Sequence, residues 1–137
     1  STEDIGTIEK EIPKKSPENW KNIDLAMTNV VENIRGTAKR IRSPYYRIAG
    51  KTGTAQVFTV KQDEEYDEEK VSKKNRDHAL FVAYAPVEDP QIAVAVIVEN
   101  GGHGGAVAAP IAKKIMDAYL LSPEQIAEIQ AKQENTL

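Results

Sequence analysis

The chain has 137 residues, of which 40% are hydrophobic and 28% are charged, so it is long enough for one domain with a modest core. Its 18 basic and 21 acidic residues give a net charge of -3, which lacks the basic excess expected of a protein that wraps nucleic acid. The sequence contains no cysteine, which excludes disulfide bonds, a thiolate nucleophile and a cysteine-ligated zinc site.

The N-terminal part of the chain predicts an arm followed by a helix. Residues 1–15 mix isoleucines with charged side chains and predict only a weak strand or an arm. A helix is predicted over 17–34, because Ser16 suits the N-cap, Pro17 suits the first helical position, and apolar residues then recur at helical spacing. We expect Trp20 to anchor this helix in the core.

Three strands are predicted in the middle of the chain. After a connector over 36–44, the run 45–58 predicts a strand with two internal glycines, which mark a close approach of another backbone or a ligand. Two nearly continuous apolar runs, 79–85 and 92–98, predict two further strands that are antiparallel, because a short turn joins them. Their continuous apolar character predicts that both faces of each strand are covered. The charged segment 61–77 predicts a solvated loop or short helix, with a flap beside a binding cleft as the alternative.

The C-terminal part predicts two helices. A glycine-rich link over 101–105 leads to the first of them, and Ser122 begins the second. The buried face of the first helix is predicted at Val107, Ile111, Ile115, Ala118 and Tyr119. A helix, a three-stranded antiparallel meander and further helices together predict an α+β fold, with helices packed on an antiparallel sheet.

The segment most suggestive of chemistry is Lys51-Thr52-Gly53-Thr54, within the predicted strand 45–58. Lys-Thr-Gly by itself is expected by chance in roughly a few per cent of chains of this length, so a plain strand with a turn is also a fair interpretation. On a strand, and with Gly50 before it, the tripeptide matches the third element of the serine enzymes that recognise penicillin. Their other elements are Ser-x-x-Lys and Ser-x-Asn or Ser-Asp-Asn.

With this segment and its context, the chain resembles the C-terminal part of the transpeptidase domain of class B penicillin-binding proteins, and within that class the proteins of cell elongation. The resemblance covers nearly everything from Ser16 to Leu121. The segments that carry it are 16–20 (Ser-Pro-Glu-Asn-Trp), 35–38 (Arg-Gly-Thr-Ala), 49–56 (Ala-Gly-Lys-Thr-Gly-Thr-Ala-Gln), 76–79 (Arg-Asp-His-Ala), 98–102 (Val-Glu-Asn-Gly-Gly) and 116–121 (Met-Asp-Ala-Tyr-Leu-Leu). It implies that 1–137 is the C-terminal portion of a domain with the penicillin-binding transpeptidase and serine β-lactamase-like fold.

The resemblance also implies a serine-type D,D-transpeptidase that cross-links peptidoglycan stem peptides through an acyl-enzyme and binds β-lactams. It assigns the catalytic cation to Lys51, substrate contacts to Thr52, Gly53 and Thr54, and an oxyanion-hole donor to the backbone N–H of Thr54. It places the protein at the periplasmic face of the bacterial inner membrane, with a membrane glycosyltransferase of the elongation machinery as a partner. No cofactor, metal or nucleic acid is expected. Because side chains alternate along a strand, Lys51 and Thr52 serve one cleft only from a twisted edge strand.

The nucleophile of this chemistry is not found in the sequence. None of the five serines, at positions 1, 16, 43, 72 and 122, begins Ser-x-x-Lys or Ser-x-Asn. We therefore expect a fragment that is inactive alone and that needs the missing upstream part of the same domain. Two alternatives stay open: a non-catalytic binding or interaction module, and a serine β-lactamase fragment. Neither histidine has a partner at metal-ligand spacing, so we expect a structural role for His78 and a flexible connector at His103.

Overall fold

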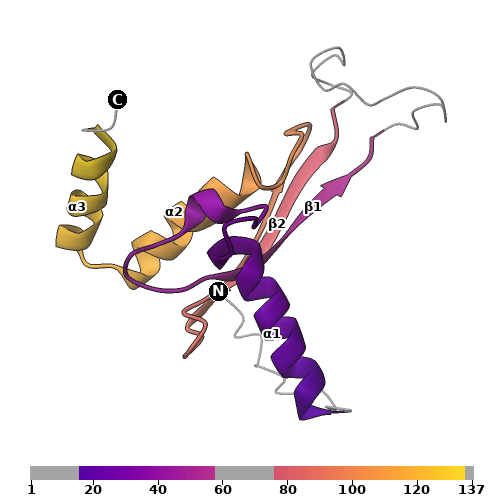
Figure 1. The fold of residues 1–137 in the computed structure, drawn as a ribbon. Helices are drawn as coiled ribbons and strands as arrows, with labels where there is room; N and C mark the ends of the chain where they lie inside the picture. Colours follow the sequence, from indigo (N-terminus) through magenta and orange to yellow (C-terminus); the bar gives the residue numbers. More distant parts are fainter. Residues whose placement is uncertain (1–15, 58–75, 135–137) are drawn as a thin grey trace, which may run out of the picture.

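The computed structural model describes residues 16–57 and 76–134. In chain order its elements are the helix α1 (Pro17–Glu32), the 3-10 turn η1 (Lys39–Ile41), the strands β1 (Ala49–Ala55), β2 (His78–Ala85) and β3 (Ile92–Val98), and the helices α2 (Ala108–Leu120) and α3 (Pro123–Glu134). The strands form one antiparallel sheet in the order β1-β2-β3 (Figure 1). The α+β meander predicted from the sequence is confirmed. The expectations for 1–15 and for most of the charged loop, 61–75, lie outside the described residues.

Helix α1 begins where the sequence predicts and ends two residues earlier. The Ser16 side chain accepts a hydrogen bond from the Glu18 N–H at 3.3 Å, which satisfies one of the free donors of the first turn. Much of α1 projects beyond the sheet (Figure 1), and its buried residues, Thr28 and Val31, lie in its second half. Trp20 is 36% exposed, so the prediction that it anchors the core is wrong for the described structure.

The core lies between α2 and one face of the sheet. Phe81 and Ala83 of β2 point into it and are 0% and 5% exposed. The buried residues of α2 are Ala108, Ala109, Ala112 and Met116. The prediction for this helix is wrong at Ile111, Ile115 and Tyr119, which are 41%, 44% and 64% exposed, and at Ala118, which is also exposed. Val107 does pack against the core, as predicted. Three alanines on the buried face allow the helix to approach the sheet closely, and Met116 is the one large side chain among the buried residues of α2.

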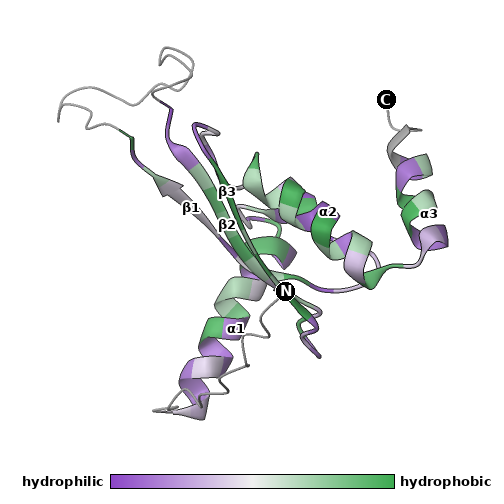
Figure 2. Cartoon of the chain, turned by 180° about the vertical axis from the view of Figure 1, so that it is seen from behind, coloured by the Kyte–Doolittle hydropathy of each residue, from purple (hydrophilic) through white to green (hydrophobic). Residues whose placement is uncertain are grey.

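The other face of the sheet is open over much of its area. Apolar residues run along β2 and β3 (Figure 2), yet Val82 is 47% exposed and Ile97 is 67% exposed. Helix α1 reaches one end of this face, where the Tyr84 hydroxyl donates a hydrogen bond to Asp24 at 2.8 Å. The prediction that both faces are covered is therefore wrong for the described residues. Lys51 lies on this open face as the cross-strand partner of Val82.

A hydrogen-bonded cluster connects the segment before β1 to α2. The half-buried Tyr46 hydroxyl donates to an Asp117 carboxylate oxygen at 2.7 Å, and the Lys113 ammonium donates to the same oxygen at 2.6 Å. Burial and the Asp117 carboxylate raise the pKa of Tyr46, because both disfavour a charged phenolate. The cluster fixes where β1 starts relative to the helix that covers the core.

Candidate active site

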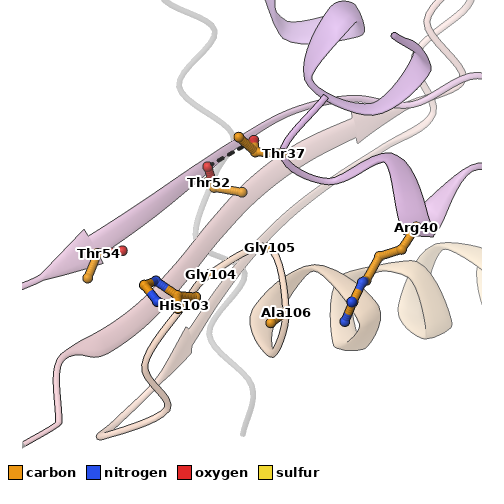
Figure 3. A pocket seen from close by; sticks show the side chains of 8 residues that line it. All are labelled: Thr37, Arg40, Thr52, Thr54, His103, Gly104, Gly105 and Ala106. Carbon is orange, nitrogen blue, oxygen red and sulfur yellow. Dashed lines mark hydrogen bonds between the residues drawn. The ribbon is translucent and has the colours of Figure 1, made fainter. Parts of the chain in front are cut away.

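A cavity of about 360 Å³ opens beside β1, between η1 and the loop that leads into α2 (Figure 3). Its lining residues are Thr37, Arg40, Thr52, Thr54, His103, Gly104, Gly105 and Ala106. They come from three separate stretches of sequence, so the cavity exists only in the folded chain.

Strand β1 contributes two threonine hydroxyls to this cavity. Thr52 and Thr54 are two positions apart and therefore share one face of the strand. The Thr52 hydroxyl lies 3.3 Å from the Thr37 hydroxyl, and either oxygen can donate the hydrogen bond. Within the described residues β1 pairs with β2 alone, so it forms one edge of the sheet. The structure thus places hydroxyl donors beside a strand edge to which an extended peptide can add.

The glycine-rich loop forms the opposite wall because it packs directly against the backbone of the sheet. A Cβ atom on Gly104 would lie 2.2 Å from the Leu80 carbonyl oxygen and 2.7 Å from that of Gly53. A Cβ atom on Gly105 would lie 2.4 Å from the Thr37 carbonyl oxygen. Only glycine allows this approach, so these two positions set the width of the cavity.

Asp77 forms hydrogen bonds to both walls of the cavity, beyond the end of β1 and at the start of the glycine-rich loop. Its side-chain oxygen accepts a hydrogen bond from the Val57 N–H at 3.2 Å, and its backbone carbonyl accepts one from the Gly102 N–H at 2.8 Å. The His78 ring accepts a hydrogen bond from the Asn100 N–H at 2.9 Å, in the turn after β3. Asn100 has a positive φ of 54°, which asparagine tolerates in such turns. His78 thus makes a structural contact at this end of the sheet.

Lys51 lies on the face of β1 opposite to the threonines. Its side chain is exposed, and its ammonium group donates a hydrogen bond to the Thr52 carbonyl oxygen at 2.6 Å. The structure therefore brings Thr52 and Thr54 to the cavity and leaves Lys51 outside it. The role of Lys51 as the catalytic cation stays a prediction.

Sequence reasoning missed three of the cavity side chains. Thr37 lies in the segment 35–38, which supports the family resemblance but was given no role in the site, and Arg40 lies in the predicted connector, where no motif marks it. His103 was expected to be a flexible connector, whereas its ring lies on the cavity wall (Figure 3). The one available signal was the run of glycines around His103, since glycines indicate close packing of a backbone as well as flexibility.

The residues that line the cavity suit a negatively charged ligand. They supply hydroxyls, a guanidinium, an imidazole and the backbone that leads into the N-terminus of α2, and none of them is Asp or Glu. Among the described residues, no group of three or more His, Asp or Glu side chains is placed to hold a metal ion. No described helix is long and apolar enough to span a bilayer.

Comparisons with known proteins agree on one family. Residues 7–117 match the penicillin binding protein transpeptidase domain. The peptidoglycan D,D-transpeptidase MrdA of Acinetobacter baumannii is 49% identical over 105 residues, which cover 77% of this chain and 15% of that protein. The crystal structure of Pseudomonas aeruginosa PBP2 in complex with WCK 5153 superimposes with a TM-score of 0.67 at 46% identity, over 83% of this chain and 22% of that one. The penicillin G acyl-enzyme complex of Mycobacterium tuberculosis penicillin-binding protein A superimposes with a TM-score of 0.52 at 34% identity, over 77% of this chain and 21% of that one. The chain thus spans a small part of each relative.

Proposed function

Because the chain belongs to the penicillin-binding protein transpeptidase family, in the class B branch with MrdA and PBP2, we propose that it is part of a serine-type peptidoglycan D,D-transpeptidase. The observation that carries the proposal is the position of Thr52 and Thr54. Both belong to the Lys-Thr-Gly-Thr segment, and both line an open cavity beside an edge strand.

In this proposal β1 binds the C-terminal end of a stem peptide. The hydroxyls of Thr52 and Thr54 donate hydrogen bonds to the terminal carboxylate, as charge-assisted donors do at anion sites. The substrate backbone lies along the edge of β1 as an added strand. Gly53 leaves room for that backbone, and the N–H of Thr54 is one of the donors that stabilise the oxyanion.

The bond-making step belongs to a serine outside these residues. Its oxygen attacks the carbonyl carbon of the penultimate D-alanine, the C–N bond to the terminal D-alanine breaks, and that D-alanine leaves as a free amine carrying the proton. An amine of a second stem then attacks the ester, so a new peptide bond forms and the serine regains its proton. A β-lactam undergoes the first step by ring opening, but its leaving nitrogen stays tethered to the acyl group. We assign Lys51 to the proton transfers of this sequence.

We further propose that the complete protein acts at the periplasmic face of the inner membrane, together with a membrane glycosyltransferase in wall elongation. Both statements rest on family membership. No described side chain marks the surface that would meet this partner.

A labelled penicillin tests the proposed function. We expect the complete protein that contains this chain to form a covalent adduct on a serine outside these residues, and a polypeptide of these residues alone to form none. We expect Thr52→Val to slow acylation of the complete protein about tenfold, since one charge-assisted hydrogen bond is lost, and Thr52→Ser to restore most of the rate. Labelling of the isolated chain, or no labelling of the complete protein, would contradict the proposal.

A further inference from the structure

A second and larger hollow lies outside the cavity beside β1. It is a groove of about 630 Å³ between η1, α2 and α3, and the chemistry proposed above does not use it. Helix α3 lies beyond the C-terminal end of α2 and away from the sheet (Figure 1). The Tyr45 hydroxyl donates a hydrogen bond to the Glu128 carboxylate, which connects α3 to the segment before β1. Helix α3 thus forms the outer wall of the groove.

The wall from α3 is apolar where it faces the groove. The Ser122 N–H donates to the side-chain oxygen of Gln125 at 2.9 Å, and the Gln125 N–H donates to the Ser122 hydroxyl at 3.4 Å, so a capping box fixes the start of the helix. Ile126 and Ile129 are three positions apart and therefore share one face of α3, and both line the groove. The other walls add three apolar residues, Pro44, Pro110 and Ala118.

The groove is cationic, although the chain as a whole has a net charge of -3. Its charged lining residues are Arg40, Arg42, Lys113, Lys114 and Asp117. The Lys113 ammonium is paired with the Asp117 carboxylate. Arg42 donates to two backbone carbonyl oxygens at the end of α1, which satisfy its donors but leave its positive charge. Among residues 16–57 and 76–134, neither Arg40 nor Lys114 has a carboxylate partner, so three positive charges in the groove are not balanced.

An apolar wall beside unbalanced cations matches the chemistry of an acidic amphipathic helix. Such a helix places apolar side chains at i, i+3, i+4 and i+7 into a groove, and its flanking residues reach the rim. A small free anion would gain nothing from Ile126 and Ile129. An anionic bilayer surface is met by apolar residues that protrude, whereas these two isoleucines line a hollow.

We propose that the groove between η1, α2 and α3 is a docking site for an acidic amphipathic helical segment of another protein. Ile126 and Ile129 contact the apolar face of that segment. Its carboxylates pair with Arg40, Arg42 and Lys114. The docking site does not depend on the proposed function, because Lys114 and both isoleucines lie outside the cavity beside β1.

The test measures fluorescence anisotropy with the complete protein and two labelled helical peptides. Both peptides have leucines at i, i+3, i+4 and i+7, and the residues flanking this stripe are glutamates in one peptide and glutamines in the other. We expect the glutamate peptide to bind about tenfold more tightly than the glutamine peptide, and high salt to reduce the difference. Lys114→Glu should weaken binding of the glutamate peptide about tenfold, because repulsion replaces attraction. Ile126→Ser should weaken binding of both peptides about tenfold, and Ile126→Leu should restore it.

Two variants are matched controls. Lys39→Glu and Ile115→Ser make the same exchanges at exposed positions that do not line the groove, so both should keep the affinity of the unmodified protein. Melting curves show whether each variant is folded. The rate of acylation by a labelled penicillin should stay unchanged in Lys114→Glu, which separates docking from catalysis.

Three results would overturn the docking site. The first is equal affinity for the two peptides, which would exclude recognition of the acidic residues. The second is the same loss of affinity in Lys39→Glu as in Lys114→Glu, which would indicate a general charge effect. The third is no binding of either peptide to the complete protein. In that case, binding of phosphatidylglycerol vesicles that Lys114→Glu abolishes would assign the groove to a membrane surface instead, and no vesicle binding would indicate that another part of the protein covers it.

Discussion

Gly104 offers the sharpest test of how the cavity is built. We consider Gly104→Ala in the complete protein. The new Cβ would lie 2.2 Å from the Leu80 carbonyl oxygen and 2.7 Å from the Gly53 carbonyl oxygen. Both are backbone atoms of adjacent strands, so neither can rotate away. The loop must move by about 1 Å to restore ordinary van der Waals contact.

Two consequences follow from that movement. Overpacking of this kind costs about 2 kcal/mol, which lowers the melting temperature by about 4–8 °C for a domain of roughly 150–250 residues. A displacement of about 1 Å in a catalytic site slows the reaction on the order of 100-fold. We therefore expect penicillin acylation to fall much more than the stability change explains.

The assay is a melting curve together with the second-order rate of acylation, measured well below the melting temperature. Ala118→Ser is the control, because it adds one heavy atom at an exposed position of α2 and should change neither quantity. If Gly104→Ala kept both the melting temperature and the acylation rate of the unmodified protein, the close contact between loop and sheet would be refuted.

Three further predictions use the same protein. Lys51→Ala should nearly abolish acylation and leave the melting temperature unchanged, because this side chain is exposed in the described structure; near-normal labelling would argue against its catalytic role. Tyr46→Phe should destabilise the fold by about 1–2 kcal/mol in chemical denaturation, because it removes one of the two part-buried donors of the Asp117 carboxylate and leaves only Lys113, and no loss would count against the cluster. Burial and then the Asp24 hydrogen bond raise the pKa of Tyr84 from 10.0 to about 12. The unfolded chain therefore loses this proton at a lower pH than the folded chain does, so the stabilisation from Tyr84 is complete below pH 10 and is lost as pH rises toward 12. Tyr84→Phe should flatten the alkaline decline in melting temperature. If the melting temperatures of the variant and the unmodified protein fell in parallel between pH 10 and 12, Tyr84 would not be the cause of the decline.

Much of the fold was predictable because the local signals were strong. Ser16 and Pro17 marked the start of α1, and the short turn before Ile92 fixed the antiparallel pairing of β2 and β3. The coverage of the sheet was not predictable in this way. Every residue of β3 is apolar, so both of its faces look the same in the sequence. The pattern therefore does not reveal that Ile97 is exposed.

The site was predictable only where a motif marked it. The Lys-Thr-Gly-Thr segment predicted Thr52 and Thr54 as site residues. The alternation of side chains along a strand already predicted that Lys51 lies on the opposite face from them. Arg40 and His103 meet these threonines only through tertiary packing of η1 and the glycine-rich loop onto the sheet. No local sequence pattern predicts that these residues lie in one cavity, apart from the glycine required at position 104.

The uncovered side of the sheet affects how this polypeptide behaves in the test tube. Val82 and Ile97, at 47% and 67% exposed, lie on a β surface that continues to the edge at β1, which has no second strand partner among the described residues. Molecules with such a surface associate with one another through the exposed apolar face and through the strand edge. Handled without the rest of its domain, the chain should elute early from a sizing column and precipitate as it is concentrated, and mild detergent should delay that precipitation.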